Sequence, residues 1–169
     1  MKNLELKVKL DNFDSIIKKL ENKANFEGNL KQRDIYFNSK SGRLKFREIN
    51  NTAFQLIYYS RPDVSESKVS HYEVVEFDKK TANRLIHILD LSLGTKIVVA
   101  KKRQLWIYKN TRIHLDSVND LGNFLELKTV ILENKKYYFQ NEHDNVIELL
   151  DLKKLKKIKG SYSDLLKDR

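Results

Sequence analysis

The chain has no cysteine among its 169 residues, and this absence excludes several kinds of site. Disulfide bonds, cysteine-ligated zinc and a cysteine nucleophile are all ruled out. One proline and five glycines leave no stretch with the composition of a linker or a low-complexity segment. We therefore expect a single globular domain over residues 1–169.

Long apolar runs are also missing. No stretch approaches the ~18 consecutive apolar residues that a membrane-spanning helix needs. The opening MKNLELKVKL lacks the apolar centre of a signal peptide. We expect a cytoplasmic protein without a membrane partner.

The chain carries an excess of positive charge. It contains 33 lysine and arginine residues against 23 aspartate and glutamate residues, a formal net charge of +10. Such a balance suits nucleic acid, an anionic membrane surface or a phosphate-rich small molecule. The run KKLKKIK near the end could bind nucleic acid or anionic lipid, but we favour a solvated helix face there.

Residues 3–10, NLELKVKL, alternate between apolar and polar side chains. This period of two predicts a strand with one apolar face and one charged face. Similar patterns predict further strands, and the pair Asn50-Asn51 predicts a hairpin turn between two of them. The further predicted strands span residues 31–38, 43–49, 53–61, 69–77, 96–108, 111–118 and 123–132.

Helical spacing occurs in three places. It covers residues 12–25, residues 78–91 and a segment that begins at about residue 141. Asp78 can cap the second helix, and Gly94 can end it. Because short turns join most neighbouring strands, the sheet is mostly antiparallel. The sequence predicts an α+β protein in which about eight strands form a closed β-barrel.

Charged side chains repeat on one face of several predicted strands. A solvated outer face would explain this pattern, but the basic residues far outnumber the acidic ones, which is unfavourable unless an anion neutralises them. The few carboxylates fall on different strands, which a closed sheet can bring around one lumen. Lysine and arginine hold phosphate oxygens, and carboxylates hold Mg²⁺ or Mn²⁺. The basic residues are Lys7, Lys9, Arg43, Lys45, Arg47, Lys101, Arg103 and Arg112, and the acids are Glu5, Glu73, Asp116 and Glu126.

Several motifs occur in a specific order along the chain. They begin with Asn3, Glu5 and Lys7 on the first strand and continue with QRDIYF, GRLKFRE, LIYYSRPD, VVAKKRQLW, RIHLDSVNDLGNFLELK and SYSDLL. In this order and spacing the chain resembles the superfamily of class IV adenylyl cyclases and thiamine triphosphatases, the CYTH or triphosphate tunnel fold. The resemblance runs from Asn3 to about Leu166 and is strongest to the cyclase-like branch.

The resemblance implies an eight-stranded antiparallel barrel with a charged lumen and flanking helices. Members of the superfamily cleave or cyclise triphosphates with a divalent metal. The implied metal ligands are Glu5, Asp116 and Glu126, with Glu73 as a further candidate. We expect Glu5, Asp116 and Lys7 to be catalytic. The candidate triphosphate ligands are Lys7, Lys9, Arg43, Lys45, Arg47, Arg61, Lys101, Arg103 and Arg112.

Two positions depart from the family pattern. The first glutamate of the opening motif is Asn3, and the late E-x-E pair is Glu126 followed by Lys128. Lys128 removes one potential ligand and adds a positive charge near the metal site.

Four functions therefore stay open. The leading one is conversion of ATP to cyclic AMP and pyrophosphate with Mg²⁺ or Mn²⁺. The second is hydrolysis of inorganic, thiamine or nucleoside triphosphate. The third is binding of a polyphosphate or nucleotide without catalysis, which the two departures motivate. The fourth, nucleic-acid binding, rests on net charge alone and is not favoured. A homodimer is compatible with the sequence, but no residue marks its interface.

Histidine and aromatic residues are predicted to be structural. His71, His87 and His143 have no ligand spacing and are predicted to be structural or exposed. His114 is expected to be hydrogen-bonded rather than a general base. Aromatic residues are common in sheets, so core packing is favoured over stacking on a base for Tyr36, Phe37, Tyr58 and Tyr59.

Overall fold

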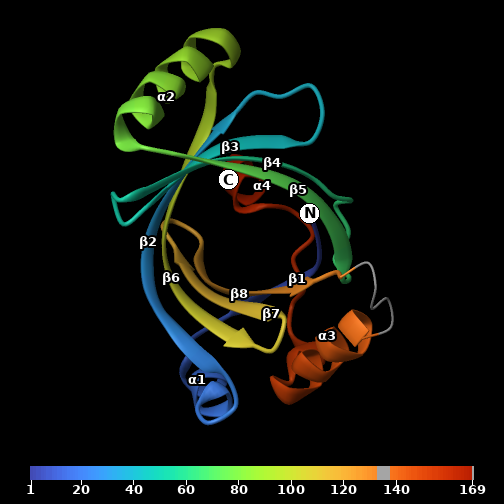
Figure 1. Cartoon of the computed structure of the whole chain (residues 1–169). Coiled ribbons are helices and arrows are strands. Elements are labelled where there is room, and N and C mark those ends of the chain that lie inside the picture. Colours follow the sequence, from blue (N-terminus) through green and yellow to red (C-terminus); the bar gives the residue numbers. More distant parts are fainter. Residues whose placement is uncertain (133–137, 169) are drawn as a thin grey trace.

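The computed structural model describes residues 1–132 and 138–168, and its strands form one closed antiparallel barrel of eight strands (Figure 1). Around the barrel the order is β1-β5-β4-β3-β2-β6-β7-β8. The predicted fold class is confirmed. The strands are β1 Lys2–Leu10, β2 Asn25–Phe37, β3 Arg43–Ile49, β4 Ala53–Ser60, β5 Lys68–Phe77, β6 Thr95–Tyr108, β7 Thr111–Val118 and β8 Gly122–Val130.

Tight turns set the register between neighbouring strands. Asn50 and Asn51 both have positive φ, 52° and 57°, in the three-residue loop 50–52 that joins β3 to β4, and Ile49 pairs with Ala53 across it. Lys109, with φ of 52°, begins the turn from β6 to β7. The turn predicted at Asn50-Asn51 is confirmed.

The helices lie outside the barrel or across one end of it. They are α1 Asp14–Leu20, α2 Lys79–Leu93, α3 Tyr138–Leu149, the 3₁₀ helix η2 Leu152–Lys154 and α4 Tyr162–Lys167. The Asp78 side chain accepts a hydrogen bond from the Thr81 amide at the start of α2, and Gly94, with φ of 74°, follows its end. Both predicted helix signals are therefore confirmed.

Two local predictions are wrong. The helix predicted over residues 12–25 ends at Leu20, because the chain turns at Asn22, whose φ is 67°, and β2 starts at Asn25. The run KKLKKIK is a helix only in η2. Its second half lies extended along β1, where the Lys9 amide donates to the Lys156 carbonyl and the Ile158 amide donates to the Lys7 carbonyl.

The apolar core lies between the barrel wall and the helices rather than inside the barrel. One cluster joins outward-facing side chains of β1, β6, β7 and β8 to α1, α3 and η2, with Leu6, Val8 and Leu20 almost fully buried. A second cluster joins Phe46 and its neighbours on β2, β3 and β4 to Ala82 of α2. Figure 1 shows α2 on one side of the barrel and α1 and α3 on the other. Burying each such side chain contributes about 1.5–3 kcal/mol, so these helices stabilise the barrel from outside.

This arrangement leaves the lumen to polar side chains. On β1, Leu4, Leu6 and Val8 face outward to the helices, while Asn3, Glu5 and Lys7 face inward, and all six are buried. The same alternation applies to the other strands because successive side chains point to opposite faces.

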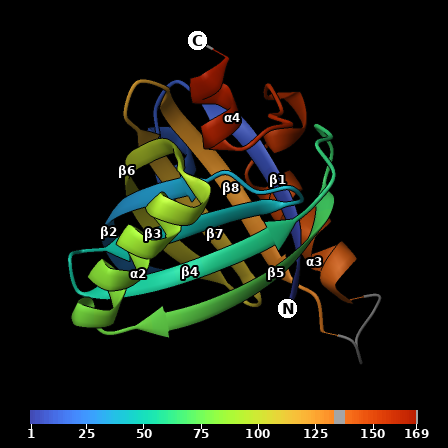
Figure 2. The same cartoon turned by 90° about the horizontal axis from the view of Figure 1, so that it is seen from above.

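One end of the barrel is covered by α4. Figure 2 shows α4 above one rim of the barrel, away from α3. A capping box at Ser161 and Asp164 starts this helix, and Tyr162 is buried against Phe124 with ring centroids 5.1 Å apart. Leu165 and Leu166 pack on the same cluster and hold α4 against the barrel. Among the described residues, no helix is both long and apolar enough to cross a membrane.

Candidate functional site

A cavity of about 350 Å³ lies inside the barrel and is lined by residues of all eight strands and of α4. Among the described residues, eight lysine and arginine side chains line it, whereas two carboxylates do. Two more carboxylates, Asp34 and Asp116, lie behind the lining, so the lumen has a formal excess of four positive charges. The eight cations are Lys7, Lys45, Arg47, Arg61, Lys101, Arg103, Arg112 and Lys128, and the two lining carboxylates are Glu5 and Glu126.

One side of the lumen carries four cations, Lys45, Arg47, Lys101 and Arg103, which we call the cationic wall. Lys45 and Arg47 come from β3, and their partner is Asp34 on β2. Lys45 Nζ lies 2.9 Å from Asp34 Oδ2, and Arg47 donates through Nε and Nη2 to both oxygens of that carboxylate at 2.7 Å. Burial would raise the pKa of Asp34, but Arg47 and Lys45 hold it well below its usual range.

Asp116 plays the same part for the other two members of the cationic wall. It accepts from Arg103 Nε and Nη2 at 2.6 Å and from Lys101 Nζ at 3.0 Å. The Tyr162 hydroxyl donates a further bond at 2.9 Å. Burial opposes ionisation of Asp116, yet Arg103 and Lys101 hold its pKa far below its usual range. Asp116 is fully buried and does not line the cavity, so this carboxylate orients cations rather than facing a ligand.

The other side of the lumen mixes acids with bases, and we call it the mixed wall: Glu5, Lys7, Arg61, Glu126 and Lys128. Pairing of β1 with β8 sets Glu5 opposite Lys128 and Lys7 opposite Glu126. Lys128 Nζ lies 3.0 Å from Glu5 Oε1 and 3.9 Å from Glu126 Oε2, between the two carboxylates. Lys7 Nζ lies 3.3 Å from Glu126 Oε1, and Arg61 Nε lies 3.6 Å from Glu5 Oε2.

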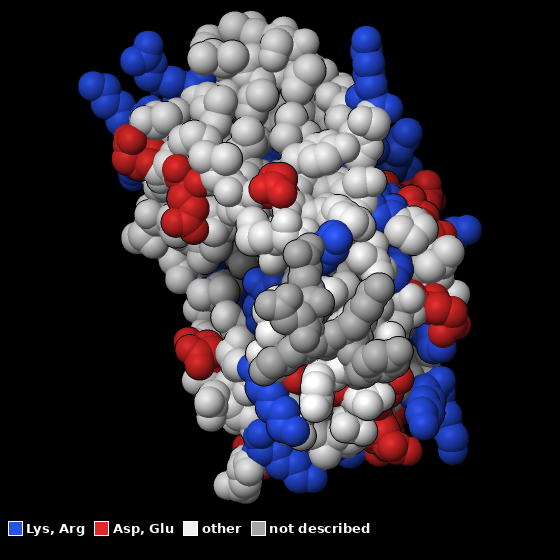
Figure 3. Space-filling model, turned by 45° about the vertical axis from the view of Figure 1, so that its right-hand side comes forward, with Lys and Arg blue, Asp and Glu red and all other residues white. Residues whose placement is uncertain are grey.

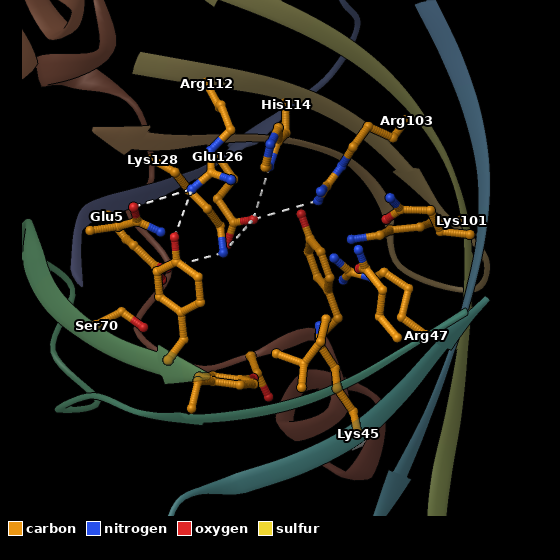
Figure 4. Close-up of a pocket in the computed structure, with 18 of the residues that line it drawn as sticks. Glu5, Lys45, Arg47, Ser70, Lys101, Arg103, Arg112, His114, Glu126 and Lys128 are labelled. Carbon is orange, nitrogen blue, oxygen red and sulfur yellow. Dashed lines mark hydrogen bonds and ion pairs between the residues drawn. The ribbon is translucent and has the colours of Figure 1, made fainter. Parts of the chain in front are cut away.

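Figure 4 shows the two walls facing each other across open space. Lys45, Arg47 and Lys101 gather on one side, whereas Glu5, Glu126 and Lys128 gather on the other. Arg103 reaches from one wall to the other, because its Nη2 also lies 3.5 Å from Glu126 Oε2.

The donor atoms present do not fit the divalent ion that the resemblance implies. Glu5 and Glu126 are the two carboxylates that line the lumen, and the Lys128 ammonium already lies between them. Asp116 is engaged by three other side chains. Across residues 1–132 and 138–168, no three histidine, aspartate or glutamate side chains are grouped to share a metal ion. A cation between the carboxylates would meet the repulsion of the ammonium at short range.

Asn3, the other departure from the family pattern, is also part of the lumen. Its Oδ1 accepts a hydrogen bond from Arg112 Nη2 at 3.2 Å, and Arg112 further donates to the Tyr72 hydroxyl at 3.5 Å. The Nε of Arg112 is buried without a hydrogen-bond partner. A neutral amide thus replaces a carboxylate beside Arg112, which leaves that guanidinium free of an ion pair among the described residues.

Burial and neighbouring positive charges lower the pKa values of three lumen lysines, Lys7, Lys45 and Lys101. Burial, and then Arg103, lower the pKa of Lys101 to about 7. Burial and Arg47 lower the pKa of Lys45 well below its usual value. His114 lies beside Glu126, with Nδ1 3.4 Å from Oε2, and burial with Arg103 lowers its pKa well below the ordinary histidine value. His114 is therefore neutral at physiological pH, and an anion in the lumen would favour the charged lysines.

Four predicted site residues do not line the cavity: Lys9, Arg43, Glu73 and Asp116, whose predicted roles as a metal ligand and catalytic residue its buried position contradicts. Lys9 donates to the Leu121 carbonyl at the α4 end, with its Nζ 4.2 Å from the Phe124 ring. Arg43 forms ion pairs with Asp63 at 2.7 Å and with Asp164 of α4 at 2.8 Å. Both residues hold the covered end of the barrel closed.

Glu73, predicted as a metal ligand, lies on the outer face of β5. It pairs with the N-terminal ammonium at 3.4 Å, and its side chain is 76% exposed. That prediction of a lumen carboxylate is wrong, because the register of β5 points Ser70, Tyr72 and Val74 inward instead.

The predicted site residues that do come together are Glu5, Lys7, Lys45, Arg47, Arg61, Lys101, Arg103, Arg112 and Glu126. Asp34 was missed, although its place in the alternation of QRDIYF puts it on one face with Tyr36. Tyr36 and Phe37 pack in core clusters as predicted, and Tyr59 packs against one of them. Tyr36 and Tyr59 also line the cavity, whereas Tyr58 is exposed, so its predicted place in the core is wrong. Tyr162 also lines the cavity, and its ring centroid lies 3.9 Å from Lys7 Nζ.

The other histidines match their predictions. His71 and His87 are exposed. His143 is buried and hydrogen-bonded to the Thr129 hydroxyl at 2.8 Å and to Ser67 at 3.0 Å, which is a structural role.

Solved structures from distant organisms share this fold. The PH1012 protein of Pyrococcus horikoshii is 24% identical, covers 96% of this chain and 98% of its own, and superposes with a TM-score of 0.81. A proposed adenylate cyclase of Vibrio parahaemolyticus is 17% identical, with coverage of 98% and 97% and a TM-score of 0.72. A chain of the Schizosaccharomyces pombe Mediator head module is 9% identical, with coverage of 90% and 96% and a TM-score of 0.66. At these identities the likeness concerns the fold alone.

Sequence comparison gives the family. No curated protein matches the chain. The model of the CYTH domain matches residues 1–162, which is nearly the whole chain and includes all eight strands and the start of α4. The chain therefore belongs to the CYTH family.

Proposed function

We propose that the barrel binds the triphosphate group of ATP or of a related nucleoside triphosphate in its lumen. The observation that carries this proposal is the cationic wall, where Asp34 and Asp116 hold four cations toward the cavity from behind. Each acid is saturated by the cations it positions, so neither needs to face the ligand. Preorganised cations that are largely buried attract phosphate oxygens more strongly than cations in bulk water do.

The same cavity offers apolar surface for an organic group. Ile49 and Leu105 line it, each two residues beyond an arginine of the cationic wall and on the side away from α4. Leu30, Ile57 and Val74 line it as well. Inorganic triphosphate would leave this surface uncovered, whereas a nucleoside could bury part of it. This favours a nucleoside triphosphate over inorganic triphosphate as the natural ligand.

The outer face seen in Figure 3 gives no sign of a nucleic-acid interface. On the face shown in Figure 3, lysine and arginine side chains are interspersed with aspartate and glutamate side chains and form no single continuous basic surface. A nucleic-acid interface would instead require a basic stripe or patch on one face.

Turnover of the bound triphosphate is the second candidate function, and membership of the CYTH family favours it. Cyclisation of ATP would release pyrophosphate, and hydrolysis would release phosphate. In either reaction Arg47 and Arg103 would stabilise charge that develops on the phosphate oxygens. A divalent ion would supply further charge neutralisation in such reactions, but the donor set around Lys128 does not fit one. We therefore favour binding of a triphosphate over its turnover as the function of this chain.

Product analysis beside a binding measurement separates the two functions. The purified chain is incubated with ATP and Mg²⁺ or Mn²⁺, the products are resolved by chromatography, and ATP binding is followed by calorimetry. Our proposal predicts ATP binding with neither product. Cyclic AMP would make the chain a cyclase, and free phosphate without cyclic AMP would make it a triphosphatase. If ATP does not bind at all, the proposed function is wrong.

A further inference from the structure

The position of Lys128 in the mixed wall supports an inference about how the lumen holds its ligand, and this inference rests on the proposed function. Lys128 extends from β8 and faces Glu5 across the β1–β8 pair. Its ammonium contacts Glu5 at 3.0 Å and approaches Glu126 to 3.9 Å (Figure 4). The two carboxylates come from different strands and point to one place, and the ammonium is in that place.

Two carboxylates that converge from neighbouring strands are the usual protein contribution to a magnesium site that also holds phosphate. Mg²⁺ takes one or two carboxylates at about 2.0–2.1 Å and completes its shell with water and substrate phosphates. An ammonium has a longer contact distance of about 2.7–2.9 Å to a carboxylate oxygen and three N–H donors. The Lys128 ammonium can therefore contact Glu5 and still direct a donor toward the lumen.

The Lys128 side chain is positioned for such a role. It is 25% exposed, whereas the side chains of Glu5 and Glu126 are 6% and 9% exposed. The Lys128 side chain is thus more accessible than either acid, and it lines the same cavity as they do. A salt bridge that served stability alone would not need a lysine that lines the cavity.

We propose that the Lys128 ammonium takes the place of a divalent cation in this lumen, so that the chain holds a triphosphate without a metal. In this arrangement Glu5 and Glu126 orient Lys128, and the ammonium bridges the mixed wall to the phosphates that the cationic wall holds from the other side.

Direct measurement of Mn²⁺ binding tests this inference without any triphosphate. Electron paramagnetic resonance distinguishes free Mn²⁺ from protein-bound Mn²⁺. We expect the native chain to leave Mn²⁺ free, and Lys128→Glu to bind about one Mn²⁺ per chain, because a third carboxylate then joins Glu5 and Glu126. Lys102→Glu is the matched control: it makes the same charge change on the outer, exposed face of β6 and should bind no Mn²⁺.

Triphosphate binding in the presence of EDTA supplies the second readout. Calorimetry with inorganic triphosphate should show binding by the native chain and a loss of about tenfold or more in Lys128→Gln. Lys128→Arg, which keeps the positive charge, should lose less. If circular dichroism shows that Lys128→Glu does not fold, the loss of triphosphate affinity in the neutral variant Lys128→Gln tests the inference instead.

The outcomes separate the inference from the proposed function. Stoichiometric Mn²⁺ binding by the native chain, or no gain of Mn²⁺ by folded Lys128→Glu, overturns the inference. Triphosphate binding that occurs with Mg²⁺ but not in EDTA overturns it too. If the native chain binds no triphosphate under either condition, the proposed function fails, while a gain of Mn²⁺ by Lys128→Glu still upholds the replacement of the metal.

Discussion

Both walls of the lumen combine carboxylates with lysine and arginine, but the carboxylates occupy different positions relative to the cavity. In the cationic wall the acids lie behind the cations, since Asp34 and Asp116 are almost fully buried and only their partners line the cavity. In the mixed wall the acids Glu5 and Glu126 reach the cavity beside their partners. An acid behind a cation fixes where the cation points, whereas an acid in front can hold a cation that meets the ligand. The role of a carboxylate in this lumen therefore depends on whether it lies behind the cavity lining or in it.

The largest expected effect comes from removing an acid behind the cationic wall. Asp116→Ala leaves Arg103 and Lys101 buried without their carboxylate, so the free energy of unfolding should fall by about 3–5 kcal/mol. Chemical denaturation followed by circular dichroism measures the change. Asp11→Ala, at an exposed position, should change it by less than about 0.5 kcal/mol. A loss of less than about 1 kcal/mol for Asp116→Ala would show that the acid does not hold this wall together.

The next effect concerns the ligand rather than the fold. Arg47→Gln removes a guanidinium that faces the cavity, and the affinity for inorganic triphosphate should fall about 100-fold. Isothermal calorimetry measures it. Arg84→Gln makes the same change on the exposed face of α2 and should bind as the native chain does. Equal affinity for the native chain and Arg47→Gln would remove the cationic wall from the binding site.

A third effect is a dependence on pH that belongs to the cationic wall. Lys101 has a pKa of about 7 in the free protein, lowered by burial and by Arg103, and a bound triphosphate would raise it. Below pH 7 the lysine is already charged. Above pH 7 binding must take up a proton, so the affinity should fall as the pH rises, by up to about tenfold per pH unit for this group.

Calorimetry at pH 8 in two buffers with different heats of ionisation measures the protons exchanged. We expect net uptake by the native chain and less uptake by Lys101→Met. Proton release on binding, or the same uptake in both proteins, would contradict the assigned role of Lys101.

The smallest effect concerns the apolar part of the cavity. Leu105→Ser should weaken ATP binding about fivefold and leave binding of inorganic triphosphate unchanged, because only the nucleoside would cover this surface. Parallel titrations with the two ligands measure the difference. If both ligands lose affinity equally, Leu105 supports the barrel rather than the nucleoside.

Much of the barrel could be predicted from the sequence because strand alternation is a local property. The pattern of NLELKVKL assigns Asn3, Glu5 and Lys7 to one face, and the structure places all three in the lumen. The hairpin at Asn50-Asn51 is local as well. The helix over residues 12–25 was predicted too long, because its apolar stripe at Ile16 and Leu20 is real but does not show where the chain turns.

The roles of the acids could not be predicted in the same way, because they depend on which strand lies opposite. Asp116 has the same local pattern as a lumen ligand, but pairing of β7 with β6 sets it opposite Arg103, and Tyr162 arrives from α4 to complete its contacts. The role of Asp34 depends likewise on the pairing of β2 with β3, which sets it opposite Arg47. Lys128 was identified as a departure from the family pattern, but only the β1–β8 register shows that its ammonium lies between Glu5 and Glu126.

The most direct test of the account is a crystal structure of the native chain bound to inorganic triphosphate, grown in the presence of EDTA. We expect the triphosphate to lie between the two walls, with phosphate oxygens in contact with Arg47 of the cationic wall and Lys128 of the mixed wall. A triphosphate bound outside the lumen, or one that leaves Lys128 without a phosphate contact, would contradict the central claim.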